Sequence, residues 1–106
     1  GLVDNAARVG AHALERLREM KRRHAGIGDV RGRGLLLGVE LVRDRDGART
    51  PDADRAEAVL YGCLSRGLSF KTTMGNVLTF TPPLITTVVQ MDQALDIVEA
   101  ALRGMT

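Results

Sequence analysis

Two adjacent prolines, Pro82 and Pro83, follow the most strand-like segment of the chain, NVLTF at residues 76–80. Proline has no backbone N–H to donate, and it disfavours helical geometry at the residue before it. The strand must therefore end here, and the chain leaves it in a fixed direction. Thr79 lies in this strand three residues before Pro82, so this position offers a threonine hydroxyl and no charge.

Residues 3–24 place apolar side chains three and four positions apart, which is typical of a helix with one buried side. We expect Asp4 to be its N-cap, and Gly26 and Gly28 to end it by adopting left-handed backbone. The buried stripe of this helix is expected to contain Val9, Ala13, Leu17 and Met20.

Two further segments carry the same helical spacing. One covers residues 53–66 and stops at Gly67, and the other runs from a cap at Thr86 or Thr87 to about Leu102. The side chains expected on the buried sides of these helices are Ala56, Val59, Leu60, Cys63 and Leu64 in the first, and Met91, Leu95, Val98 and Leu102 in the second.

The remaining apolar segments are too short or too rich in β-branched residues to favour helices. Residues 35–42 predict one strand, and residues 68–73 and 76–80 predict a hairpin around the turn Met74-Gly75-Asn76. The predicted order is α-β-α-β-β-α, an α+β fold of two layers. Its antiparallel or mixed sheet has three to four strands, and the helices cover one face through Leu17, Leu60 and Leu95. The other face is expected to be partly apolar.

Composition excludes several classes of protein. With 44% hydrophobic residues in 106, the chain predicts one globular domain, and no apolar run approaches the roughly 20 residues of a membrane span. The basic run Arg16–His24 is interleaved with Glu19 and contains no aromatic residue that could stack on a base. We therefore expect a solvated helix face, no nucleic-acid partner and no membrane partner. A single cysteine excludes an internal disulfide and favours a cytoplasmic setting.

Few residues carry a chemical signal of their own. Cys63 falls in an apolar stripe and is expected to be a core residue, and His12 and His24 are twelve positions apart, which is not a metal-ligand spacing. We predict no metal site. The glycines between residues 32 and 38 precede or lie inside a strand, whereas a phosphate-binding loop follows a strand and opens a helix. They are expected to allow a bulge or a close backbone approach.

Three phrases in this order, VRGRGLLLGVELV at 30–42, NVLTFTPPLITT at 76–87 and MDQALDIVEAAL at 91–102, resemble one known family. They are similar to the C-terminal small domain of class III (ω-type) aminotransferases, which are fold-type-I enzymes dependent on pyridoxal 5'-phosphate. The resemblance covers nearly the whole chain. It implies that residues 1–106 are the C-terminal small domain of a longer enzyme, which we expect to be a homodimer that uses an amino donor and a keto acid acceptor.

The resemblance also implies that the chemistry lies elsewhere. Pyridoxal phosphate requires a lysine, an acidic partner for its ring nitrogen and a phosphate-binding helix end. Lys21 lies in the basic helix, and Lys71 lies in a strand with no nearby acid. In the family these groups belong to a large domain, which we expect upstream of Gly1. We therefore assign no catalytic and no cofactor-binding residue to this chain and expect it to be inactive alone.

Thr79 is the one candidate substrate-binding residue. In many family members that hold an amino-acid carboxylate, the residue three before the two prolines is arginine, whose planar fork binds that group. Threonine there implies less dependence on this strand for carboxylate binding, with amines or atypical amino acids among the substrates. The alternative for Thr79 is an ordinary β-branched strand residue. The alternative for the chain is a stand-alone small-ligand-binding or regulatory domain.

Overall fold

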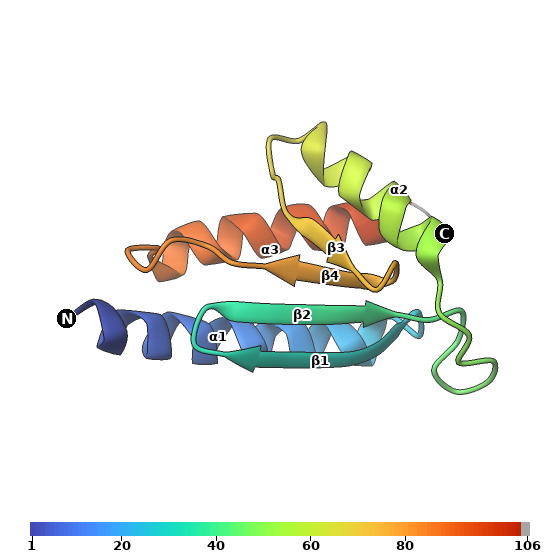
Figure 1. Ribbon diagram of the computed structural model, residues 1–106, viewed down its shortest axis with the longest axis horizontal. Coiled ribbons are helices and arrows are strands. Elements are labelled where there is room, and N and C mark those ends of the chain that lie inside the picture. The colour runs from blue at the N-terminus through green and yellow to red at the C-terminus, as the bar shows by residue number, and fades with distance from the viewer. Residues whose placement is uncertain (105–106) are drawn as a thin grey trace.

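The computed structural model describes residues 1–104 and has the order α-β-β-α-β-β-α. The elements are α1 (Leu2–Arg23), β1 (Ile27–Arg33), β2 (Leu36–Leu41), α2 (Ala53–Leu64), β3 (Lys71–Thr73), β4 (Val77–Phe80) and α3 (Val88–Arg103), drawn in Figure 1. The four strands form one antiparallel sheet in the order β1-β2-β4-β3. The α+β class is confirmed.

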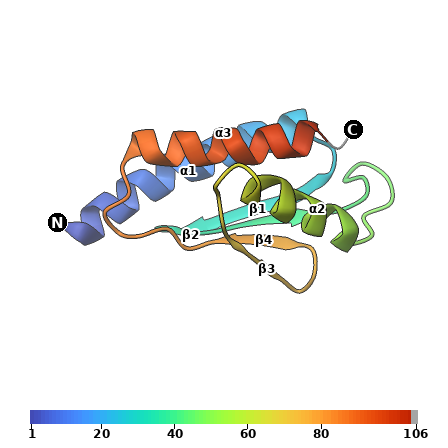
Figure 2. The ribbon, with the colours of Figure 1, turned by 90° about the horizontal axis from the view of Figure 1, so that it is seen from above.

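The sheet has one covered face and one open face. Figure 2 shows α1 and α3 side by side over one face, and α2 packs against α3 and the β3 end of the sheet. Side chains alternate between the two faces along each strand. Leu37, Val39 and Leu78 enter the helix-covered core, whereas Gly38, Val77 and Thr79 lie on the opposite face. We call this opposite side the outer face.

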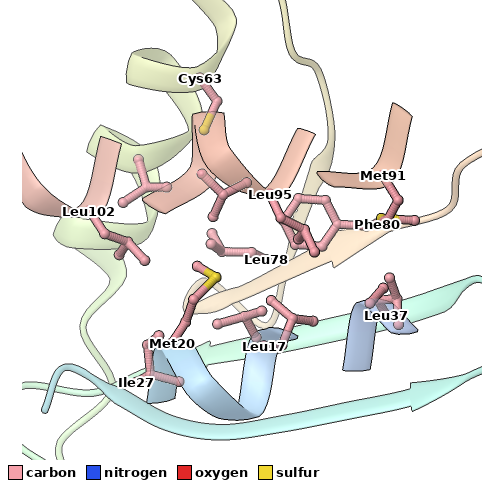
Figure 3. Close-up of a cluster of buried hydrophobic side chains, with 14 of the residues drawn as sticks. Leu17, Met20, Ile27, Leu37, Cys63, Leu78, Phe80, Met91, Leu95 and Leu102 are labelled. Atoms are coloured by element: carbon pink, nitrogen blue, oxygen red, sulfur yellow. The ribbon is translucent and has the colours of Figure 1, made fainter. Parts of the chain in front are cut away.

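All three helices contribute to a single apolar core, part of which appears in Figure 3. The predicted stripes of the first and last helices are buried throughout. In α2, Ala56, Val59 and Cys63 are buried, but Leu60 is half-buried and Leu64 is 54% exposed, so the buried stripe is narrower than expected. Because α2 covers the end of the sheet, it has fewer neighbours to enclose a wide apolar side.

The sequence analysis missed β1. Its outer-face residues Asp29, Arg31 and Arg33 are exposed, so the segment does not have the apolar content expected of a strand. A two-residue turn, Gly34-Leu35, separates it from β2, and Gly34 adopts φ +57. Glycine at the first central position with positive φ is typical of a type II′ hairpin turn. One predicted strand is therefore the second half of a hairpin.

Two predicted helix boundaries are wrong. Gly1, not Asp4, is the N-cap of α1, and Asp4 lies in the first turn, where its charge is favourable to the helix dipole. The helix ends at His24 in extended backbone, so neither Gly26 nor Gly28 provides a left-handed stop. The predicted stop at Gly67 is confirmed, with φ +87.

The C-terminal half follows its sequence signals closely. The β3–β4 hairpin turns through Met74 and Gly75, both with positive φ. Thr87 caps α3 in a reciprocal pair with Gln90, since each side chain bonds the other residue's backbone N–H at 3.0–3.1 Å. Between these elements, Thr86 donates to the Pro83 carbonyl, which fixes the path after the prolines. No helix within residues 1–104 is long and apolar enough to cross a bilayer.

Candidate functional site

Thr79 lies on the outer face, near the middle of the sheet. Its neighbours across the strands are Gly38 of β2 and Lys71 of β3. The Thr79 hydroxyl is 2.9 Å from that of Thr73, so the two form a hydrogen-bonded pair on this face. Thr79 is half-buried, although Figure 2 shows no helix over the outer face of the sheet. The threonine therefore presents a polar group to the surface that the fold leaves open.

A groove of about 350 Å³ runs over the outer face beside Thr79. We call it the Thr79 groove; its walls include Arg31, Leu36, Thr73, Met74, Val77 and Thr79. Gly38 forms the floor between Thr79 and β1, and a side chain there would meet Arg31 and Val77. Leu36 is 56% exposed and Met74 is 92% exposed, so the partly apolar outer face is confirmed.

The cations around the Thr79 groove differ in their pairing. Arg31 donates to Glu40 at 2.9 Å and lies 3.9 Å from Asp29, so its charge is compensated. Arg33 and Lys71 form no ion pair within residues 1–104. Thr79 itself supplies only a hydroxyl. The groove can accept a neutral or apolar group against Thr79, and a charge near its two ends.

A second hollow, of about 410 Å³, lies on the helix side between α3 and the segments that flank β3 and β4. Phe70, Phe80, Met91 and Leu95 line it, and the two phenylalanine rings are 4.6 Å apart. Pro82 and Pro83 form part of its rim. None of its lining residues is a carboxylate. We therefore interpret it as an opening in the apolar core, next to Pro82 and Pro83.

The other residues singled out in the sequence have structural roles. Cys63 is fully buried, and burial raises the pKa of its thiol to about 11, so it is a core residue as predicted and not a nucleophile. His12 lies 2.7 Å from Asp92, and His24 lies 3.0 Å from Glu99. The hydrogen bond from His12 lowers the pKa of the Asp92 carboxyl. Within the described residues no group of three metal-binding side chains comes together.

The residues present do not fit a complete pyridoxal phosphate site. Lys71 lies at the exposed β3 edge opposite Thr79, and the acids of the outer face, Asp29 and Glu40, pair with Arg31. Lys21 lies on α1, away from both hollows. Within residues 1–104, neither lysine thus stands beside an acid that could serve the ring nitrogen of the cofactor.

Sequence reasoning missed the partners that shape the Thr79 groove. Arg31 and Arg33 belong to the unpredicted strand β1, and the register that places Gly38 between Arg31 and Thr79 is not visible in the sequence. Strict alternation of polar residues at 29, 31 and 33 was the available signal.

Comparison with known proteins identifies the family. Residues 1–102 match the aminotransferase class-III family. The chain is 45% identical over 105 residues to isoleucine 2-epimerase of Lentilactobacillus buchneri, covering 99% of this chain and 23% of that protein. It is 46% identical over 101 residues to (R)-1-hydroxy-2-aminoethylphosphonate ammonia-lyase of Vibrio splendidus, covering 95% of this chain and 21% of that protein.

A solved structure agrees with the sequence relatives. The PMP-bound form of an aminotransferase from Vibrio fluvialis superposes with a TM-score of 0.87 at 31% identity, covering 98% of this chain and 23% of that chain. The present chain therefore spans less than a quarter of the length of each of these relatives. Because the family match extends from residue 1 to residue 102, the chain belongs to the class-III aminotransferase family.

Proposed function

We propose that the chain is the C-terminal small domain of a pyridoxal-phosphate-dependent class-III enzyme, in which it closes over the cofactor cleft and helps to select the substrate. The observation that carries the proposal is the match over residues 1–102 by a chain that spans about 23% of its relatives. The uncovered outer face is consistent with it, since an apolar, concave surface without a helix favours contact with a further domain.

The whole enzyme is proposed to move an amino group between an amino acid or amine and a keto acid or aldehyde, as a cytoplasmic homodimer. The cofactor, held by the large domain, supplies the electron sink for this chemistry. The contribution of the present chain is to orient the substrate and exclude water above the cofactor. Relatives named as an epimerase and an ammonia-lyase make racemisation and elimination the second candidate activities.

Expressed alone, the chain is expected to bind no pyridoxal phosphate through a lysine and to show no transaminase activity. Lys71 is exposed at a strand edge without an acidic partner, so the acid that a pyridoxal phosphate site needs for the ring nitrogen is missing beside it. The measurement is a visible absorbance titration with pyridoxal phosphate, followed by borohydride reduction and mass spectrometry. A saturable band that disappears in Lys71→Arg or Lys21→Arg would contradict the proposal.

Thr79→Arg in the full-length enzyme is expected to favour substrates with a carboxylate. An arginine at this position adds a bidentate donor to a groove that now offers a hydroxyl. We expect kcat/KM for an amino-acid donor to rise at least about tenfold relative to that for the matching amine, since a hydrogen bond to a charged group contributes about 1.5–3 kcal/mol and about 1.4 kcal/mol is a factor of ten. Steady-state kinetics on paired donors measures this ratio.

Thr79→Val is the matched control, because it keeps the shape and removes the hydroxyl. Its ratio of amino-acid to amine kcat/KM should stay near that of the wild type. If Thr79→Arg also leaves the ratio unchanged, Thr79 does not face the substrate.

A further inference from the structure

A third hollow, of about 310 Å³, lies where the end of α1, the loop after β2 and the first turn of α2 meet. These segments come together at one end of the molecule in Figure 1. We call it the α1–α2 hollow. Its polar lining consists of Arg23, His24, Arg43, Asp44 and Arg55. Four of these five side chains can carry a positive charge, and none of them lines the Thr79 groove.

Two of the four cationic side chains already have a partner. Arg23 and His24 both contact the buried Glu99, at 2.9 and 3.0 Å. The one acid of the lining, Asp44, accepts the backbone N–H of Asp46 at 3.0 Å and is turned into its own loop. The charges of Arg43 and Arg55 are therefore not compensated by the acid that lines the hollow.

Arg43 and Arg55 have unused donors. The exposed Arg43 side chain makes no hydrogen bond and no ion pair within residues 1–104. The Nε–H of Arg55 is buried and has no acceptor, and Nη2 has only a long contact of 3.4 Å to the Leu102 carbonyl. The Arg55 guanidinium lies against Gly26, where a Cβ would be 3.4 Å from its central carbon. A buried N–H without an acceptor is rare and costly, so it calls for a partner.

Compensation of a helix dipole does not account for these arginines. Basic residues often cover the carbonyls at a helix C-terminus. At the end of α1 this role belongs to Arg45, whose guanidinium donates to the carbonyls of Lys21, His24 and Ile27. Arg55 belongs to the first turn of α2, where the dipole favours an anion and disfavours a guanidinium.

We propose that the α1–α2 hollow binds a phosphate group, held by the guanidinium groups of Arg43 and Arg55. A phosphate presents several acceptor oxygens to planar donor forks, which suits two arginines that approach from different segments. It supplies the acceptor that the Arg55 Nε–H lacks. The site is separate from the Thr79 groove and does not depend on the proposed function. Its ligand is either inorganic phosphate or the phosphoryl group of a small phosphomonoester.

The test is a titration of the 15N-labelled chain with sodium phosphate at constant ionic strength, balanced with sodium chloride. The Arg55 Nε–H resonance and the Gly26 amide are the reporters. We expect saturable shifts of both, and a parallel titration with glycerol 3-phosphate shows whether a phosphomonoester binds more tightly than the free ion. The proposal would be overturned if the shifts did not saturate with phosphate, or if chloride or acetate produced the same saturable shifts.

Variants link the shifts to the two arginines. Arg43→Met and Arg55→Met should each weaken phosphate binding at least about tenfold, because each removes a charge-assisted donor pair. Arg33→Met is the matched control, since Arg33 is an exposed arginine of the outer face without an ion pair, and its affinity should equal that of the wild type. If Arg55→Met does not fold, the phosphate affinity of Arg43→Met decides, because Arg43 is exposed. If Arg33→Met weakens phosphate binding as much as Arg43→Met does, the attraction is non-specific and the proposal is wrong.

Discussion

Gly10→Ala is expected to destabilise the fold by about 3 kcal/mol or more, as forced overpacking does when backbone must move. Gly10 lies in the middle of α1 and is buried against the β1–β2 turn. A Cβ at this position would be 1.9 Å from the carbonyl oxygen of Gly34 and 2.4 Å from its carbonyl carbon. Both atoms are backbone, so the helix and the hairpin would have to separate.

The sign of this effect is what makes the prediction specific. In an ordinary helix interior, replacing glycine by alanine stabilises by up to about 1 kcal/mol. Gly62→Ala in α2 is therefore the control, since its Cβ would lie 3.4 Å from that of Ala101, an ordinary contact. Urea unfolding followed by circular dichroism gives both free energies. If the free energy of unfolding of Gly10→Ala is within about 0.5 kcal/mol of that of the wild type, α1 does not pack closely against the backbone of Gly34.

The Gly10–Gly34 contact also shows where sequence reasoning stops. The glycines of residues 32–38 were expected to permit a close backbone approach, but a Cβ at Gly34 would meet nothing within 4 Å, so Gly34 contributes only the carbonyl that approaches the helix. Its partner Gly10 is on a helix 24 positions earlier, where a glycine looks only like a weak helix former. The pairing follows from how α1 crosses the hairpin, and that hairpin was itself unpredicted. A contact of this kind needs both elements before it can be inferred.

The helices could be predicted because their burial is one-sided and periodic. Val9, Ala13 and Leu17 repeat at helical spacing and are fully buried. In contrast, β1 lies at the sheet edge and is buried mainly through Ile27 and Gly28, with only Val30 half-buried further along. A search for strands by apolar content cannot find a strand whose outer face is charged and whose inner face contains glycine.

For the candidate site, the sequence predicted one residue, Thr79, but not the residues that surround it in the sheet. The Pro-Pro pair directed attention to Thr79, and its place on the outer face follows from its opposite parity to Leu78 and Phe80 of the core. The register that puts Lys71 and Gly38 beside it depends on which strands pair, which local patterns do not reveal. That Thr79 binds substrate remains a prediction.

Glu99 is a buried acid that the sequence hid inside an apolar helix stripe. It is 6% exposed, accepts two hydrogen bonds from Arg23 at 2.9 and 3.0 Å, and lies 3.0 Å from His24 Nε2. Arg103 approaches to 3.7 Å. Burial by itself would raise the pKa of this carboxyl, but the hydrogen bonds from His24 and Arg23 outweigh burial, and the pKa lies below its ordinary value.

Glu99→Gln is expected to destabilise the fold by about 2–3 kcal/mol at pH 7, because it leaves charged donors facing a neutral side chain in a buried site. It breaks the contact that joins the end of α1 to α3. Since the pKa of Glu99 is lowered on folding, its charge stabilises the fold above the unfolded-state pKa of about 4.3, and this contribution is lost as the pH falls through the folded-state pKa. The difference between wild type and variant should therefore be largest near neutral pH and shrink in acid.

Urea unfolding of both proteins at pH 7 and at about pH 3.5, below the unfolded-state pKa, measures the two differences. Asp96→Asn is the matched control on α3, because Asp96 pairs with Arg16 at 3.0 Å while its side chain is 70% exposed. An exposed pair contributes at most about 1 kcal/mol, so this control should change stability little at either pH. A Glu99→Gln effect that is as small as the Asp96→Asn effect, or that is the same at both pH values, would mean that the charge of Glu99 does not hold α1 against α3.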